Sequence, residues 1–396
     1  MEHMNSDVPR LGPQAAISRE PLRLTLPRLF CKVAMFLALN NVILSEYSVA
    51  QPRADNARDT SQAGRTSILP LPILYYTPET GFAGGAALLG LRRAAESDST
   101  ARPSSLMLDV IYTQKNQIIA EIFPEIFLDK GNYHIIGSIQ FSRYPLKFYG
   151  IGNTTPDALE EPYTSRTLRL SIDALRRIAG DFSGGISLFF ETRTLSELRS
   201  DGSLERGTIA GSLGGRTVGA GVVFQWDMRD NIFSPTAGRY YTVSLRKSSP
   251  RIGSDFDFTY FTLDFREYFK VAESSVLAMQ AMATMTGGNV PFYLLAQLGG
   301  SNMMRGYYEG RYRDKELLAV QLEYRMPIFW RFGGAVFASV GDVAPALGQL
   351  SSHDAKTSYG LGLRYLFDAT EKVNIRIDVG FGRNTSGLYF TANEAF

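Results

Sequence analysis

Apolar and polar residues alternate along most of this chain, from about Leu69 almost to its end. A period of two places successive side chains on opposite faces of an extended strand, so that each such segment has one apolar and one polar face. In residues 372–382, Val373, Ile375, Ile377, Val379 and Phe381 alternate with Lys372, Asn374, Arg376 and Asp378. The pattern predicts an all-β chain whose strands each carry charge on one face.

The alternation divides the chain into about sixteen strands. They cover residues 70–77, 82–93, 104–116, 118–128, 132–143, 163–178, 181–194, 213–226, 238–248, 255–269, 274–286, 316–327, 331–343, 357–367, 372–382 and 385–395. An even number of antiparallel strands, with apolar faces toward lipid and polar faces toward a wet lumen, is typical of an outer-membrane barrel. A soluble sandwich or propeller would also alternate, with its charges in bulk water.

Connection lengths favour the barrel over the soluble alternatives. If both termini lie on the periplasmic side, the longest connections (144–162, 195–212, 287–315 and 344–356) all fall on the outer side, as in outer-membrane barrels. Backbone polar groups cannot stay unpaired in lipid, so the strands have to close on themselves. Two irregularities are expected: Pro70 and Pro72 deny ladder donors to the first strand, and the phase switch near Tyr260 and Phe261 predicts a bulge.

Composition excludes several other classes of protein. The net charge is +2, from 41 basic and 39 acidic residues, which does not favour nucleic acid. Beyond the N-terminal region no run approaches the roughly 18 apolar residues of a spanning helix. A single cysteine rules out a framework of intramolecular disulfides.

The N-terminal region has the pattern of an export signal. Arg23, Arg28 and Lys32 precede an apolar stretch over residues 33–44, and residues 48–50 resemble a small-x-small cleavage site. We therefore expect a signal peptide region at 1–50, a short periplasmic linker at 51–69 and an outer-membrane barrel at 70–396. A short buried helix is the alternative interpretation of the apolar stretch.

One loop and the strand after it resemble a known family. The loop reads Gly299-Gly300-Ser301-Asn302-Met303-Met304-Arg305-Gly306-Tyr307, and Glu323-Tyr324-Arg325-Met326-Pro327 follows. Both are similar to the sixth-loop Arg-Gly-aromatic motif and the Glu-x-Arg-x-Pro strand of the BamA/TamA-like bacterial surface antigen family. The resemblance implies that this sixth outer loop inserts into the lumen, with Met304, Arg305, Gly306 and Tyr307 as its motif.

A loop buried in this way needs a carboxylate, because an unpaired buried guanidinium would cost several kcal/mol. Glu323 is the predicted partner of Arg305, and Arg325 lies on the same strand. The alternative is a solvated Arg305 in a flexible outer loop, where Gly306 only serves a turn. Residues 337–341 resemble a Phe-x-Asp-x-Gly pattern on a supporting lumen strand, with Ser339 in place of the acidic residue and with Gly341 retained.

Two further segments carry the resemblance. Asp227, Arg229 and Asp230, followed by Pro235 and Gly238, look like the family's periplasmic Asp-x-Arg-Asp turn. They have two interpretations, a contact point for a periplasmic protein or ordinary turn chemistry, and we favour the second. Residues 148–155 are similar to an outer-loop signature of some members.

The resemblance implies an assembly or translocation barrel in the bacterial outer membrane, a conduit or membrane-remodelling component for protein or lipid. The alternative is a passive diffusion channel or structural barrel. Expected partners of this monomeric barrel are outer-membrane lipid and a separate periplasmic protein or exported client, because only about 20 residues replace the family's periplasmic modules. No catalytic or metal-binding motif is found around His134 and His353 in the sequence, so we expect that the protein is not an enzyme and binds no cofactor or metal.

Overall fold

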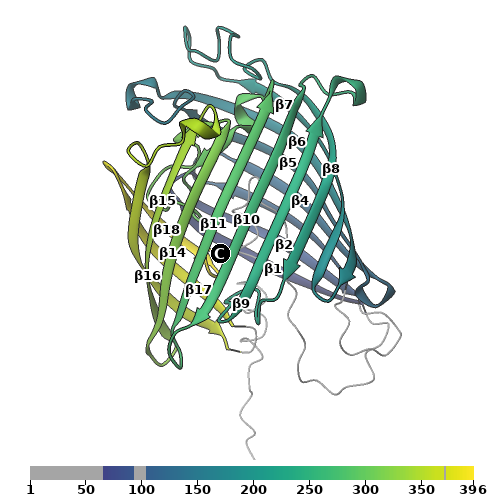
Figure 1. The fold of residues 1–396 in the computed structure, drawn as a ribbon, viewed down its shortest axis with the longest axis vertical. Helices are drawn as coiled ribbons and strands as arrows, with labels where there is room; N and C mark the ends of the chain where they lie inside the picture. The colour runs from purple at the N-terminus through teal and green to yellow at the C-terminus, as the bar shows by residue number, and fades with distance from the viewer. Residues whose placement is uncertain (1–65, 93–103, 370–371) are drawn as a thin grey trace, which may run out of the picture.

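The computed structural model describes residues 66–92, 104–369 and 372–396. The expected signal peptide region and residues 51–65 of the expected linker lie outside these ranges. Within the described residues, sixteen antiparallel strands close into one barrel (Figure 1), which confirms the predicted fold class. The first strand begins four residues inside the expected linker, at Thr66.

The barrel strands are listed here in chain order. They are β1 (Thr66–Thr77), β2 (Gly81–Arg92), β3 (Ser104–Thr113), β4 (Ile118–Leu128), β5 (Tyr133–Phe148), β6 (Glu161–Ala179), β7 (Phe182–Ser196), β8 (Gly215–Asp227), β9 (Gly238–Ser248), β10 (Phe258–Lys270), β11 (Val276–Gly288), β14 (Glu316–Phe329), β15 (Phe332–Ala344), β16 (Lys356–Asp368), β17 (Val373–Gly382) and β18 (Thr385–Ala392).

The remaining elements are short. The connection from β11 to β14 holds a small two-stranded sheet of β12 (Ala296–Leu298) and β13 (Tyr312–Asp314). Single 3-10 turns are η2 (Asp129–Gly131), η3 (Asp157–Leu159), η4 (Pro250–Ile252), η5 (Phe292–Leu294) and η6 (Leu347–Gln349). Among the described residues, no helix has both the length and the apolar character required to cross a membrane.

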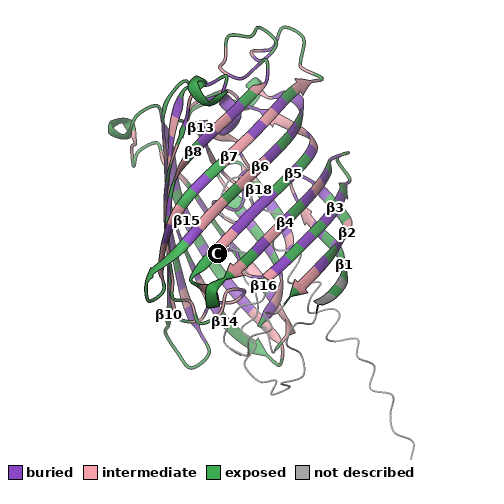
Figure 2. Cartoon of the chain, turned by 90° about the vertical axis from the view of Figure 1, so that its right-hand side faces the viewer, coloured by how far each residue is buried: buried purple, intermediate pink, exposed green. Residues whose placement is uncertain are grey.

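Side chains along each strand are alternately exposed and buried, as the bands in Figure 2 show. Large apolar side chains point outward, among them Val110 on β3 and Leu361 on β16, which are 58% and 62% exposed. Polar side chains point inward, and Gln321 and Asp378 are completely buried. The barrel therefore presents an apolar outer surface and a polar interior, as the alternation predicts.

Most strand limits follow the predictions closely, but β1 begins four residues early, β18 ends three residues early, and one strand runs further into the outer end, which carries the longer loops. β5 continues to Phe148, five residues beyond its predicted end at position 143. Tyr144 and Phe148 point inward and are buried at 9% and 0% exposure, packed beneath the outer loops. Because the inward face becomes aromatic there, the alternation disappears although the strand continues.

The bulge predicted near Tyr260 and Phe261 is wrong. β10 pairs with β9 and with β11 from Phe258 onward without a register shift. Phe258 and Tyr260 point inward and join an aromatic cluster with Phe292 of the long loop. The phase switch in the sequence reflects this apolar packing inside the outer end of the lumen.

Strands β1 and β18 meet at a seam that is short. β1 pairs with β2 along its whole length but with β18 at one registered pair, Tyr76 opposite Phe390. Continuing that register would place Leu74 opposite Ala392, where β18 ends. Residues 66–73 of β1 therefore lie beyond the end of β18.

The prolines of β1 face this seam. In an antiparallel sheet, the backbone groups of successive residues of one strand point alternately to its two neighbouring strands. The Phe82 carbonyl accepts a hydrogen bond from the Gln114 amide, on the side of β3, at 2.7 Å. The even-numbered residues of β2 therefore bond toward β3, and its odd-numbered residues bond toward β1. Pro70 pairs with Leu88 and Pro72 with Ala86, both even, so the two prolines face β18 instead. Proline is tolerated at such an edge because no ladder donor is required there.

Candidate functional site

The β11–β14 connection folds into the barrel and brings its Arg-Gly-Tyr motif to the lumen wall. Gly306 has φ +111, a region that favours glycine, and a Cβ there would lie 2.8 Å from backbone atoms of Phe381 on β17. Met304 and Tyr307 are 0% and 1% exposed and pack with Leu317 in an apolar cluster. The loop is therefore packed against the wall and does not stay solvated.

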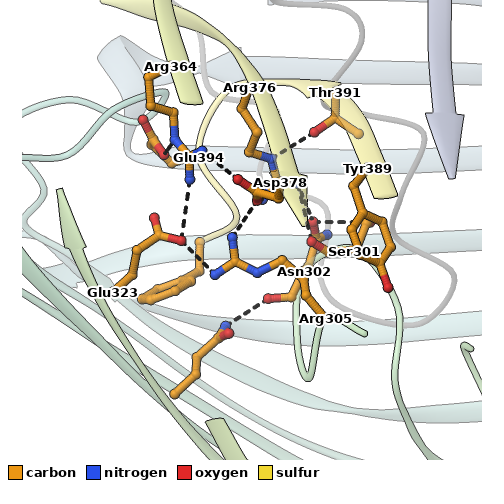
Figure 3. A network of polar contacts seen from close by, with 12 residues as sticks. Ser301, Asn302, Arg305, Glu323, Arg364, Arg376, Asp378, Tyr389, Thr391 and Glu394 are labelled. Atoms are coloured by element: carbon orange, nitrogen blue, oxygen red, sulfur yellow. Dashed lines mark hydrogen bonds and ion pairs between the residues drawn. The ribbon is translucent and has the colours of Figure 1, made fainter. Parts of the chain in front are cut away.

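Arg305 is completely buried and bonds to two strands (Figure 3). Its Nη2 lies 2.6 Å from Oε2 of Glu323 on β14, and its Nη1 donates to Oδ2 of Asp378 on β17. Its guanidinium carbon also lies 3.5 Å from the ring centre of Phe337 on β15. The loop arginine thus has two carboxylates and an aromatic face in place of water.

Three more arginines complete a network around the same carboxylates. Arg325 Nε lies 2.7 Å from Oε1 of Glu323, and Arg364 bonds to Asp378. Arg364 Nε also reaches Oε2 of Glu394 at 2.8 Å. Arg376 lies 3.3 Å from Asp378. Such buried networks add little net stability over an apolar core, but removing one member costs about 3–5 kcal/mol, because it leaves a buried charge unpaired.

Uncharged contacts fix the loop to the last strands. The Gly306 amide donates to the Tyr389 hydroxyl at 2.9 Å, and the Thr385 hydroxyl donates to the Gly306 carbonyl at 3.0 Å. The Tyr307 hydroxyl donates to the Thr357 carbonyl at 3.1 Å. Both β18, which forms one side of the seam, and β16 are therefore bound directly to the loop.

The structure brings most of the predicted loop-site residues together and separates one. Met304, Arg305, Gly306, Tyr307, Glu323 and Arg325 lie in this one region. Ser339 bonds instead to the Ser358 hydroxyl at 3.3 Å. Gly341 allows close approach, because a Cβ there would lie 3.3 Å from Leu298 of β12.

Asp378, Arg364 and Glu394 also belong to the site, although neither the alternation nor the resemblance predicted them there. The alternation places Asp378 on the lumen face of β17, but not at the depth that the loop reaches. Figure 3 shows the three side chains converging with Glu323 from different parts of the chain.

The Asp-x-Arg-Asp turn joins β8 to β9 at the end of the barrel away from the long loops, the end predicted to be periplasmic. Asp227 bonds to Arg229 at 2.8 Å, and Asp230 accepts the amides of Thr236 and Ala237 at 2.8 and 3.1 Å. Burial disfavours the charge of Asp230, but these bonds hold its pKa below the usual range. These are turn-forming contacts.

The end of this turn depends on the two remaining motif positions. Pro235 accepts a hydrogen bond through its carbonyl from Arg325 Nη1 at 3.4 Å, so the turn reaches the network of the loop arginine. Gly238 has φ +103, and a Cβ there would lie 2.1 Å from the Met228 carbonyl oxygen. Only glycine fits the start of β9 at this point.

Two glutamates meet at the outer end of the lumen, Glu309 through its backbone and Glu79 through its carboxylate. The Glu309 amide of the loop donates to Oε1 of Glu79, in the β1–β2 turn, at 2.9 Å. Burial and, to a lesser extent, the charge of Glu79 raise the pKa of Glu309 to about 8, and Arg313 opposes both effects. Burial likewise raises the pKa of Glu79. The first hairpin and the loop therefore meet through a pair that favours protons.

The two predicted non-catalytic histidines lie apart from the network. His134 Nε2 lies 2.7 Å from Oε1 of Glu125, on the lumen face of β4, and His353 is exposed in an outer loop. Within the ranges that the structure describes, no cluster of three or more metal-ligating side chains could hold an ion.

The fold and the site together define a class: a closed sixteen-stranded outer-membrane-type barrel whose lumen holds its own arginine-bearing outer loop. Residues 211–396 carry an Omp85 superfamily domain, so the resemblance to the BamA/TamA-like family is confirmed. This matched region includes the periplasmic turn, the lumen loop and all the carboxylates and arginines of the network. No curated protein matches the sequence.

Several solved structures share the fold. BamA from Haemophilus ducreyi lacking POTRA domains 1–3 has a TM-score of 0.60 at 14% identity, covering 83% of this chain and 70% of that one. CdiB from Acinetobacter baumannii gives 0.54 at 12% identity, covering 85% and 66%. CdiB from Escherichia coli gives 0.52 at 10% identity, covering 83% and 62%. The chain thus spans about two thirds of the CdiB structures, and at these identities the likeness concerns the fold.

Proposed function

We propose that this chain is an outer-membrane assembly or translocation barrel that acts as a conduit for protein. The observation that carries the proposal is the complete burial of Arg305 between Glu323 and Asp378. A loop that folds into the lumen and is bonded to its wall at β14 and β17 narrows the lumen, whereas a porin needs a continuous wet passage. Membership of the Omp85 superfamily supports the same class.

The short seam supports a second route, sideways into the bilayer. β1 and β18 share one registered pair, and the seam-facing prolines remove two donors from β1. Unpaired backbone amides at a strand edge are costly in lipid. Pro70 and Pro72 have no amide proton, so they lower the free-energy cost of opening the seam along β1. The contacts of the lumen loop with Tyr389 and Thr385 on β18 would make loop movement and seam opening depend on each other.

The second candidate function is a passive channel. A cavity remains between the loop and the wall of β4 to β7, lined by polar side chains that include Gln140, Arg169 and Arg193. A solute pathway through this cavity would not need the loop to move. The proposed location for either function is the outer membrane, where the apolar outer surface contacts lipid, and the proposed partner is an exported client or a separate periplasmic protein.

Two measurements test the proposal. In planar lipid bilayers, the purified barrel should rarely conduct, whereas a passive channel would conduct steadily. In cells, loss of the chain should deplete a defined set of surface or secreted proteins. Wild type should restore that set, and a Tyr76→Cys/Phe390→Cys variant, oxidised across the registered pair, should not. Steady conductance together with an unchanged protein inventory would contradict the conduit.

A further inference from the structure

The β8–β9 turn crosses the periplasmic mouth of the barrel. We call residues 228–237 the strap. β8 and β9 lie halfway around the ring from the seam, yet the Phe233 carbonyl accepts the Glu394 amide at 3.3 Å. Asn374 Nδ2 on β17 lies 3.3 Å from the Ser234 hydroxyl. The strap thus connects the wall opposite the seam to β17 and to the segment that directly follows β18.

The strap covers an apolar surface on the inside of the barrel. Phe233 is 5% exposed and packs in one cluster with inward side chains of the first three strands and with Val373 and Ala392 near the seam. We call these inward residues of the first strands the inner seam face: Leu71, Ile73, Ala87, Leu89, Met107 and Ile111. Outward side chains of the same strands, such as Leu74 and Val110, are apolar too. This part of the wall is apolar on both sides, which a purely aqueous channel does not require.

A carboxylate without a partner lies within the inner seam face. Asp109 is 4% exposed, on the lumen side of β3 between Met107 and Ile111, and neither of its oxygens has a hydrogen-bond partner in the described residues. Glu121 lies directly opposite it in the register of β3 and β4.

Among the described residues, no base bonds to Asp109. Glu121 accepts from the Gln140 amide and is also stabilised by the charge of Arg169, whose guanidinium lies 2.6 Å from Glu191. A buried carboxylate opposite another is unfavourable unless a cation or a proton joins them. Only two carboxylates meet here, fewer than a metal ion would require, so the geometry fits an ammonium or guanidinium group.

We propose that the inner seam face is a binding site for a segment of the client polypeptide that carries apolar side chains and one lysine or arginine. The basic group binds between Asp109 and Glu121, and Phe233 of the strap occupies the apolar part in the resting barrel. This inference rests on the proposed function and specifies the chemistry of its substrate. Binding requires the strap to leave the seam strands.

The first test fixes the strap in place. Ser234 and Asn374 touch through their side chains, so these positions are chosen for a Ser234→Cys/Asn374→Cys disulfide in a background with Cys31→Ser, and titration of free thiols verifies that the bond has formed. The probe is a synthetic peptide of alternating leucine and serine with one central lysine, added to the purified barrel in nanodiscs. The reduced barrel should bind it at least about tenfold more tightly than the oxidised one. Equal binding by both forms would overturn the role of the strap.

The second test examines the acidic pair. The reduced barrel should prefer the lysine peptide to the same peptide with glutamine, and Asp109→Asn should abolish that preference. The matched control is Asp173→Asn, a lumen carboxylate on β6 that lies 3.9 Å from Arg246, which should keep the preference. Retained preference in Asp109→Asn would contradict the site.

Folding is checked separately. Because Asp109→Asn removes an unpaired buried charge, its melting temperature should not fall. The proposed function and the inferred site can fail independently. If the peptide binds but loss of the chain does not change the protein inventory of cells, the inferred site stands and the proposed conduit function is rejected. If the inventory changes but the peptide does not bind, only the inferred site is rejected.

Discussion

Arg305 bonds to Asp378, 73 positions further along the chain, in a lumen where the resemblance led us to look for an acid at position 339. Ser339 stands there and bonds to Ser358 instead. The second carboxylate of the loop arginine is therefore supplied by β17, the strand that neighbours β18 at the seam. This arrangement ties the loop to the β18 side of the seam.

The pairing of Arg305 with Glu323 predicts non-additive losses. Arg305→Ala and Glu323→Ala should each reduce the free energy of unfolding by about 3–5 kcal/mol, because each leaves buried charges unpaired. The double variant should be little worse than either single one, since both remove the same interaction. Urea unfolding in liposomes measures the free energy of unfolding of the wild type, of each single variant and of the double variant. Fully additive losses would argue against the pair.

The different positions of Asp378 and Ser339 predict unequal effects of substitution. Asp378→Asn removes a charge bonded to both Arg305 and Arg364, so the folded fraction of the barrel should fall strongly. Ser339→Ala removes one hydroxyl contact, so the expected loss is about 1 kcal/mol. Heat-modifiable mobility on gels reports the folded fraction of each. A larger loss for Ser339→Ala would mean that β15, not β17, carries the second contact.

Close packing of the loop against β17 predicts that Gly380 is as intolerant as Gly306. A Cβ on Gly380 would lie 2.6 Å from the Arg305 carbonyl carbon. Gly380→Ala should therefore displace the loop, at a cost of about 1–3 kcal/mol, and increase protease cleavage after Arg305. Gly287→Ala is the matched control, because nothing lies within 4 Å of a Cβ there. Similar cleavage of both variants would show that the loop is not packed against β17.

The sequence could predict the barrel because its dominant constraint is local. Each strand in contact with both lipid and water has to alternate, so the strand limits could be read directly from the chain. The prediction failed where the inward face of a strand does not contact water. In β5 beyond position 143, Tyr144 and Phe148 pack under loops, so the strand end was missed. In β10, the inward Phe258 and Tyr260 disturb the alternation in the way that a bulge would.

The candidate site was predicted only in part, for a similar reason. Alternation places Asp378 and Glu323 on the lumen face, but the depth that a loop reaches is not a local property. The resemblance supplied Arg305 and Glu323, whereas Arg364 and Glu394 join them only through the closure of the barrel.

The pair of Glu79 and Glu309 predicts that the barrel loses stability as pH rises. Burial raises the pKa of Glu309 from 4.5 in the unfolded chain to about 8, so the folded state binds the proton more tightly. The contribution is complete below about pH 4.5 and is lost as pH rises through about 8, because the unfolded chain then holds fewer protons than the native one. Unfolding free energies measured across this window should decrease for the wild type and decrease less steeply for Glu309→Gln, in which Glu79 still contributes. Glu205→Gln, at an exposed outer-loop position, is the control and should follow the wild type. An unchanged slope in Glu309→Gln would show that the hairpin and the loop do not meet through a protonated pair.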